Sequence, residues 1–221
     1  KIYKIMADKY VDIDTLKYML YDVHKLEDLL NRDRFVDHDK ESLDMFLEST
    51  KDFADRELFP FIKEMDEKPA YHKDGKVYVH SQVETMMKKG GELGFISASF
   101  DYDIGGMQIP LMAHTAATYI LDAANNHLPG YAGLTQGAAE LIIHFANKNL
   151  VETYVPEMLS GNWGGTMCLT EPQAGSSLSD IVTKATPTEN GYHKISGQKN
   201  IYFGWRQSIR RKYCSFSISK N

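Results

Sequence analysis

The chain has 221 residues, a formal net charge of -5 and a pI near 5.9. This length allows one large or two small domains, and the acidic balance argues against a nucleic-acid-binding protein, which would normally carry a basic face. The two cysteines, Cys168 and Cys214, form no CxxC pair, which argues against a disulfide framework or a zinc knuckle and favours a reducing, cytoplasmic setting.

The N-terminal part of the sequence predicts helices. Residues 1–11 form an extension ahead of the first helical pattern. Over residues 12–32, and again from about residue 39 to Pro60, apolar residues recur every three or four positions between charges, as in amphipathic helices. Pro60 should end or kink the second helix because it has no backbone N–H. No apolar run of about 18 residues occurs, so we expect no membrane span.

The next elements are also expected to be helical. Ser81 and Glu84 have the spacing of a reciprocal capping pair, which predicts a helix from residue 81 to the glycines at 90–94. The stretch SFDYDIGGMQIP, residues 99–110, is expected to be a loop. Further helices are expected over residues 111–125, 131–147 and 150–159. Residues 12–161 are therefore predicted to be an all-helical domain, with Tyr119, Tyr131 and Phe145 in its core.

The pattern changes at Trp163. The short runs GTMCLT, IVTKATP and YHKISG are rich in β-branched or aromatic residues, and the last two flank Glu189-Asn190-Gly191, a strong hairpin turn. Residues 162–199 are therefore predicted to begin a β domain. The expected fold class is α+β, with a helical domain followed by the first strands of a β-barrel-like domain.

The segment GTMCLTEPQAGSSLSDI, residues 165–181, is the strongest candidate site. Pro172 breaks the backbone after Thr170, and residues 175–177 offer amides and hydroxyls without bulk, as in a nest for a phosphate oxygen. Such a loop can equally be a hairpin connection whose hydroxyls cap their own backbone. The eight histidines do not cluster at metal-ligand spacing, so no metal site is expected.

The order of these parts resembles the acyl-CoA dehydrogenases, flavoenzymes that run from a helical domain through a β domain into a second helical domain. Three stretches carry the resemblance: FDYDIGGMQIP, YVPEMLSGNWGGTMCLTEPQAGSS and IVTKATPTENGYHKISGQK. They lie within residues 80–199, and the string Leu-Thr-Glu-Pro-x-Ala-Gly-Ser is the most specific. The helices before residue 80 fit the same fold but do not identify the family.

The resemblance implies FAD as cofactor and assigns residues to it. Leu169 and Thr170 would meet the pyrimidine side of the flavin ring, Thr170 through its amide and hydroxyl. Gly175 and Ser176 would face the FAD pyrophosphate, and Ser176 would also lie near the acyl-CoA substrate. Donors at these positions would stabilise the negative charge of the reduced flavin. The expected cofactor-binding set is Met167, Cys168, Leu169, Thr170, Gly175 and Ser176.

The sequence departs from the family pattern in two places. Ser177 stands where aspartate is usual, and residues 200–221 match nothing in the family, including Phe203 at a position that is normally Thr or Ser. One set of permitted codons, read one base later from about Lys199, gives KIFISGGDNQYEGNIVHLVLAR, which looks like the family's continuation. We therefore expect residues 200–221 to be read out of frame.

The resemblance implies α,β-dehydrogenation of an acyl-CoA to the trans-2-enoyl-CoA in fatty acid β-oxidation, with electrons passing to an electron-transfer flavoprotein. The family's catalytic base is a glutamate of the C-terminal helical domain, and its full-length members are homo-oligomers. The sequence contains no counterpart of that domain, so we expect a truncated and inactive chain with no catalytic residue of its own. An alternative is a non-catalytic helical binding or interaction module, suited to the charged helix faces of residues 12–58.

Overall fold

The computed structural model describes residues 10–200 and the backbone of residues 213–217. The fold is α+β. The helices are α1 (Ile13–Tyr18), α2 (Glu27–Leu30), α3 (Lys40–Phe53), α4 (Ile62–Glu67), α5 (Gln82–Glu92), α6 (Leu111–Asn125), α7 (Pro129–Phe145) and α8 (Lys148–Leu159). The strands are β1 (Tyr71–Lys73), β2 (Lys76–Tyr78), β3 (Gly164–Cys168), β4 (Lys184–Pro187), β5 (His193–Ser196) and β6 (Tyr213–Ser217).

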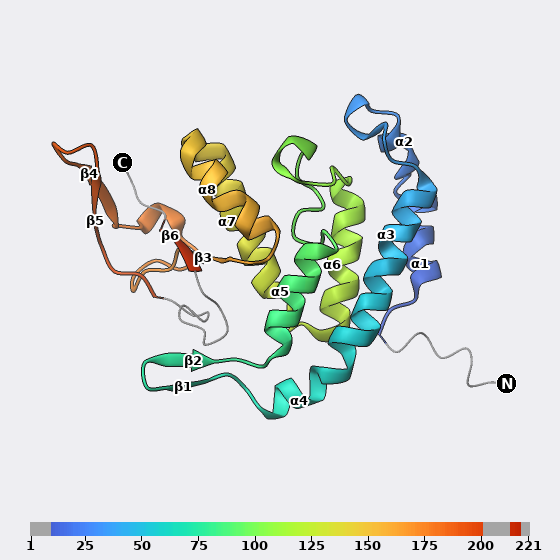
Figure 1. The fold of residues 1–221 in the computed structure, drawn as a ribbon, viewed down its shortest axis with the longest axis horizontal. Coiled ribbons are helices and arrows are strands. Elements are labelled where there is room, and N and C mark those ends of the chain that lie inside the picture. The colour runs from blue at the N-terminus through green and yellow to red at the C-terminus, as the bar shows by residue number, and fades with distance from the viewer. Residues whose placement is uncertain (1–9, 201–212, 218–221) are drawn as a thin grey trace.

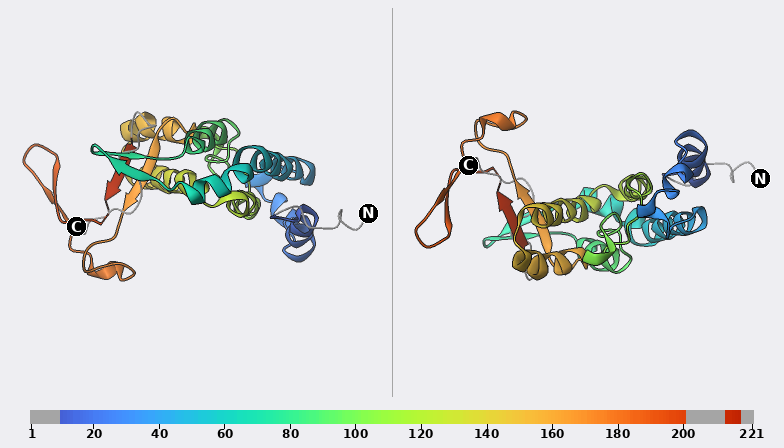
Figure 2. Two further views of the ribbon diagram at one scale, coloured as in Figure 1. Left: turned by 90° about the horizontal axis from the view of Figure 1, so that it is seen from below. Right: turned by 90° about the horizontal axis from the view of Figure 1, so that it is seen from above.

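The helices pack side by side around one hydrophobic core, as Figure 1 shows. Helix α3 contacts α6, and α7 contacts α5, α6, α8 and β3. Fully buried aliphatic side chains, among them Leu43, Leu47, Met86 and Ile120, fill the space between the helices. Seen from below and above, the β4–β5 hairpin extends beyond the helices at the end of the molecule opposite α1 (Figure 2). Within the described residues, no helix is both long enough and apolar enough to cross a bilayer.

The helix expected over residues 12–32 is interrupted. Asp12 caps α1 by accepting hydrogen bonds from the amides of Asp14 and Thr15. The chain continues as a π-helical turn that ends at Val23. Lys25 then adopts a left-handed backbone with φ of 53° before α2 begins. The break turns Leu26 into the core, where it is fully buried, so tertiary packing overrides the local helical pattern.

The capping pair expected at Ser81 and Glu84 is wrong. Ser81 precedes α5 but its side chain makes no capping hydrogen bond. The amide of Gln82 donates instead to Nδ1 of His80 at 3.2 Å, and Glu84 forms an ion pair with Lys88 one turn later. A capping box is present at α3, where Asp39 and Ser42 satisfy each other's backbone amides.

Residues 12–161 are not entirely helical, because β1 and β2 form an antiparallel hairpin. Asp74 and Gly75 both have positive φ, 51° and 74°, as in the two-residue turns that suit hairpins. The rings of Tyr71 and Tyr78 stack with centroids 5.1 Å apart. The Asp-Gly dipeptide at residues 74–75 is a signal for a hairpin turn. The prediction of an all-helical domain did not take it into account.

Two of the three aromatic residues expected in the core are exposed. Tyr119 is 52% exposed and Phe145 is 83% exposed, whereas Tyr131 is half-buried and packs against the core. The helical spacing that predicted their burial does not distinguish the buried face of α6 or α7 from its edge. Both helices were themselves correctly predicted, and α6 has the expected bounds.

The predicted strands are present. β4 and β5 form the expected antiparallel hairpin, with Lys184 opposite Ser196 and Pro187 opposite His193. Strand β3 pairs in parallel with β6, from Gly164 opposite Tyr213 to Cys168 opposite Ser217. Strand β6 lies in the tail that the sequence predicted to be out of frame, and residues 201–212 and 218–221 of that tail lie outside the described residues.

Candidate functional site

Strand β3 leads into the candidate site from a fixed position on α7. The amide of Gly165 donates a hydrogen bond to Oγ1 of Thr135 on α7 at 3.0 Å, and both groups are buried. A Cβ at Gly165 would lie 2.6 Å from Cβ of Ala138 and 2.8 Å from Cε of Met158. Glycine is therefore required for this close approach, and α7 determines where the segment after β3 emerges.

After β3 the chain makes a tight turn at Glu171. The amide of Glu171 donates to the carbonyl of Ala174 at 2.9 Å, and the amide of Ala174 donates back at 3.1 Å. Pro172 and Gln173 form the exposed tip of this turn. Because the bridge is antiparallel, Thr170 and Gly175 flank it on its open side. The residues that the resemblance assigned to the flavin ring and to the pyrophosphate therefore directly precede and follow this bridge.

The side chain of Glu171 is fully buried inside the loop that follows. It accepts hydrogen bonds from the amides of Val182 at 2.7 Å and Thr183 at 3.1 Å, and from the side chain of Gln173 at 2.7 Å. Its ion pair with Nζ of Lys199 is 2.8 Å long. These donors, Lys199 above all, hold the pKa of the Glu171 carboxyl well below its usual range.

Lys199 also contacts the segment before the turn. Its Nζ donates to the carbonyl of Leu169 at 3.1 Å, and the amide of Asn200 donates to the carbonyl of Thr170 at 2.8 Å. The side chain of Lys199 is only 9% exposed. Residues 169–171 are therefore held by residues 199 and 200. Neither Glu171 nor Lys199 belonged to the site predicted from the sequence, because nothing in their spacing shows that they meet.

The six predicted cofactor-binding residues differ in accessibility. Cys168 is buried, Met167, Leu169 and Thr170 are half-buried, and Gly175 and Ser176 are exposed. Apart from Gly175 and its two chain neighbours, no described residue has an atom within 4 Å of the place where a side chain at Gly175 would begin. The exposed hydroxyl of Ser176 and the backbone beside Gly175 are uncharged hydrogen-bonding groups without bulk. This donor set fits a phosphate-bearing cofactor, while the described residues contain no group of three potential metal ligands.

The backbone of the loop at residues 99–110 explains why it contains two adjacent glycines. Gly105 has a φ of 86°, a left-handed conformation that favours glycine. A Cβ at Gly106 would collide with the carbonyl of Phe100. The loop is tied to the N-terminal region, since Nε2 of His38 is 3.0 Å from the carbonyl oxygen of Met107 and Arg34 pairs with Asp101.

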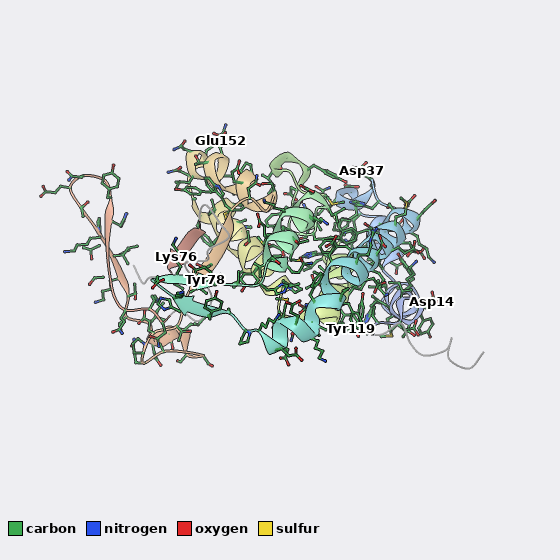
Figure 3. The ribbon with its side chains drawn as sticks, turned by 60° about the horizontal axis from the view of Figure 1, so that its bottom comes forward. Asp14, Asp37, Lys76, Tyr78, Tyr119 and Glu152 are labelled. Atoms are coloured by element: carbon green, nitrogen blue, oxygen red, sulfur yellow. The ribbon has the colours of Figure 1, made fainter. Side chains whose placement is uncertain are left out.

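A cavity of about 1080 Å³ lies elsewhere, between the region of α1 and α6. Its walls are mainly apolar and include Leu16, Met19, Leu111 and Tyr119. In Figure 3, Asp14 of α1 marks this end of the molecule. Lys76 and Tyr78 of the β1–β2 hairpin lie on the other side, toward strands β3, β4 and β5. The cavity includes none of the residues of the motif around Glu171, so it is separate from the candidate site.

The family model described as acyl-CoA dehydrogenase, N-terminal domain, matches residues 40–162. The 3-methylmercaptopropionyl-CoA dehydrogenase of Ruegeria pomeroyi is 31% identical over 153 residues, which are 69% of this chain and 26% of that protein.

This chain belongs to the acyl-CoA dehydrogenase family. Two solved structures of the family share its fold. The butyryl-CoA dehydrogenase from Megasphaera elsdenii aligns with a TM-score of 0.65 at 22% identity, covering 83% of this chain and 46% of that one. A glutaryl-CoA dehydrogenase from Mycobacterium smegmatis in complex with FADH2 aligns with a TM-score of 0.62 at 18% identity, covering 77% and 40%. The present chain therefore spans less than half the length of these relatives.

Proposed function

We propose that the chain is the flavin-facing N-terminal part of an FAD-dependent acyl-CoA dehydrogenase. The complete polypeptide would convert an acyl-CoA to the trans-2-enoyl-CoA. The observation that carries this proposal is the turn closed by the bridge between Glu171 and Ala174, which lies between Thr170 and Gly175 in the segment that resembles the family's flavin-binding motif. When bound, FAD would supply the hydride acceptor for the β-carbon of the substrate.

The roles of the residues follow from their position in the turn. Thr170 would direct its amide and hydroxyl toward the pyrimidine side of the flavin, with Leu169 beside it. Met167 and Cys168 would line the approach from β3. Gly175 and Ser176, both exposed, would donate to the pyrophosphate, and Ser176 would also face the acyl-CoA. Preorganised donors of this kind are worth more in a site that excludes water than in solution.

The substrate and partners belong to the complete polypeptide. Its acyl-CoA would lose the α-proton to a carboxylate of a C-terminal helical domain. Electrons would pass to an electron-transfer flavoprotein, and the protein would form a homo-oligomer in the cytoplasm. The name of the Ruegeria relative supports the acyl-CoA substrate, and the FADH2 complex of the Mycobacterium relative supports the flavin cofactor. We assign no carboxylate of the present chain to the role of base, so we expect it to lack dehydrogenase activity. Because it spans less than half the length of its relatives, we also expect it to bind FAD weakly or not at all.

We propose, in addition, that residues 200–221 are encoded out of frame after one extra adenine near the codon of Lys199. The support is that the shifted frame offers KIFISGGDNQYEGNIVHLVLAR, which contains the strand pattern NIVHLVLAR. Genomic sequence around this codon tests the proposal directly. Codons that cannot encode the shifted peptide would end it.

The function is tested with the polypeptide that the locus encodes when the frame is restored. We expect this protein to purify with FAD and its flavin absorbance to fall when an acyl-CoA is added without oxygen. The 221-residue chain, purified in parallel, should be colourless. A restored polypeptide that retains no flavin would contradict the proposal, and co-purification of the colourless chain with a protein partner would favour an interaction module instead.

A further inference from the structure

We propose that Glu171 and Lys199 are positioning residues that set the direction of the Thr170 amide and fix both ends of the loop at residues 172–181. The inference rests on the proposed function in one respect, since that function assigns the flavin to this segment. The contacts that support it are made by residues of this chain alone.

Lys199 holds the peptide unit between Leu169 and Thr170 in one orientation. The carbonyl of Leu169 accepts a hydrogen bond from Nζ of Lys199 at 3.1 Å. The described chain has no cis peptide bond, and in a trans peptide the C=O and the N–H point in opposite directions. The Thr170 N–H is therefore directed away from Lys199. Lys199 thus determines on which side of the chain this donor is offered.

The carboxylate of Glu171 joins the two ends of the loop at residues 172–181. Glu171 stands at its start, and its carboxylate accepts the amides of Val182 and Thr183 at its end. The side chain of Gln173 donates to the same carboxylate from within the loop. A single buried group therefore replaces the ladder hydrogen bonds that a regular hairpin would use. The loop between these points is therefore fixed at both ends. Its exposed residues, including Ser176, keep their hydrogen-bond donors accessible.

Glu171 and Lys199 act as a pair because both charged side chains are buried. The carboxylate of Glu171 is 0% exposed and the side chain of Lys199 is 9% exposed. A buried charge is costly unless it is paired and hydrogen-bonded, so either residue alone would be left in an unfavourable environment. The segment between β5 and Lys199 also lies close to Thr183, since a Cβ at Gly197 would collide with the Thr183 side chain.

The experiment uses the 221-residue chain and three variants: Glu171→Gln, Lys199→Met and the double variant. Glutamine retains the size of glutamate, but it removes the charge and presents an NH2 group to one of two amide donors. Methionine retains the length of lysine without its ammonium. Lys88→Met is the matched control, because it removes the ammonium of an exposed ion pair with Glu84 on α5. Amide hydrogen exchange is measured at Val182 and Thr183, with the amides of α6 as an internal reference.

We expect exchange at Val182 and Thr183 to accelerate about tenfold or more in either single variant, as expected from the loss of a buried charged hydrogen bond. The amides of α6 should exchange at the wild-type rate. The double variant should be no worse than the single variants, because the two residues share one interaction. The amide resonance of Thr170 should shift in Lys199→Met, and Lys88→Met should change none of these quantities.

Unchanged exchange in Lys199→Met, or effects of the two single variants that multiply fully in the double variant, would overturn the pairing. An unmoved Thr170 resonance would overturn the orientation of its amide, even if the loop loosens. A loop that loosens as expected in a protein whose frame-restored form binds no FAD would leave the positioning role intact and refute the proposed function instead. In a frame-restored form that does bind FAD, an unchanged FAD affinity in Lys199→Met would refute positioning toward the flavin.

Discussion

The hydroxyl of Thr135 in the middle of α7 accepts the amide of Gly165 in β3 at 3.0 Å, and the same hydroxyl donates to the carbonyl of Tyr131. This residue pair joins the helical part of the chain to its first β-domain strand. Since β3 leads directly to the turn at Glu171, the position of the segment that we propose faces the flavin depends on a contact made by a helix of the N-terminal domain.

Replacing Thr135 by valine tests this junction. Valine has nearly the same shape but leaves the buried amide of Gly165 without an acceptor, which should cost about 1–3 kcal/mol in the free energy of unfolding. Urea denaturation measures the change. Thr153→Val is the control, because Thr153 donates to the carbonyl of Asn149 on an exposed face of α8. The control should change the stability by less than about 0.5 kcal/mol, and equal effects of the two variants would contradict the junction.

A second prediction concerns the close approach of β3 and α7. Gly165→Ala introduces a Cβ at 2.6 Å from Cβ of Ala138, so β3 must move, at a cost of about 1–3 kcal/mol. Gly133→Ala places a methyl group on α7 with nothing within 4 Å. Because alanine favours helix over glycine, Gly133→Ala should stabilise the chain by up to about 1 kcal/mol. Thermal denaturation should therefore move in opposite directions for the two variants. Tolerance of Gly165→Ala would show that β3 is not tightly seated.

The helical part of the fold follows from the sequence where a stop signal is present, as at α5, which ends at Glu92 among the glycines at 90–94. It fails where a buried side chain far from the local pattern decides the backbone, as at Leu26, or where an exposed side chain has an apolar character, as at Phe145. The β1–β2 hairpin could have been predicted, because Asp74 and Gly75 form a standard hairpin turn.

The candidate site was predicted only in part. The residues near the flavin follow from the resemblance, and their assignment remains a prediction. The pair formed by Glu171 and Lys199 could not be predicted, since it joins residues 28 positions apart that become neighbours only when the chain folds back at the β4–β5 hairpin. Local propensity contains no information about such a contact.

A pH-dependent prediction concerns His114 in α6. Burial lowers its pKa below the ordinary 6.5, against the opposing effects of the Phe95 carbonyl and Glu140. The unfolded chain therefore binds a proton more readily than the folded chain, and stability should fall as the pH decreases below about 6.5. His114→Gln should make this fall less steep in urea denaturation curves measured between about pH 7.5 and 5.5. His72→Gln, on the exposed strand β1, is the control, and equal slopes for wild type and His114→Gln would contradict the prediction.

Helix capping gives a further comparison. The side chain of Asn147 accepts the amide of Leu150 at the start of α8, so Asn147→Ala should cost about 1 kcal/mol in the free energy of unfolding. Ser81→Ala should have little effect, because Ser81 makes no capping hydrogen bond at α5. Chemical denaturation of both variants measures the difference. A larger loss for Ser81→Ala would show that the capping pair expected from the sequence does form in solution.

The central claim is that the segment from Thr170 to Ser176 holds FAD in a complete acyl-CoA dehydrogenase. The most direct measurement is the flavin content of the frame-restored polypeptide after gel filtration, beside that of its Gly175→Val variant. Valine would place branched carbon atoms in the open space beside Gly175. The account predicts stoichiometric FAD in the restored protein and little in the variant. A restored protein that elutes folded and free of flavin, or a variant that retains as much FAD, would contradict it.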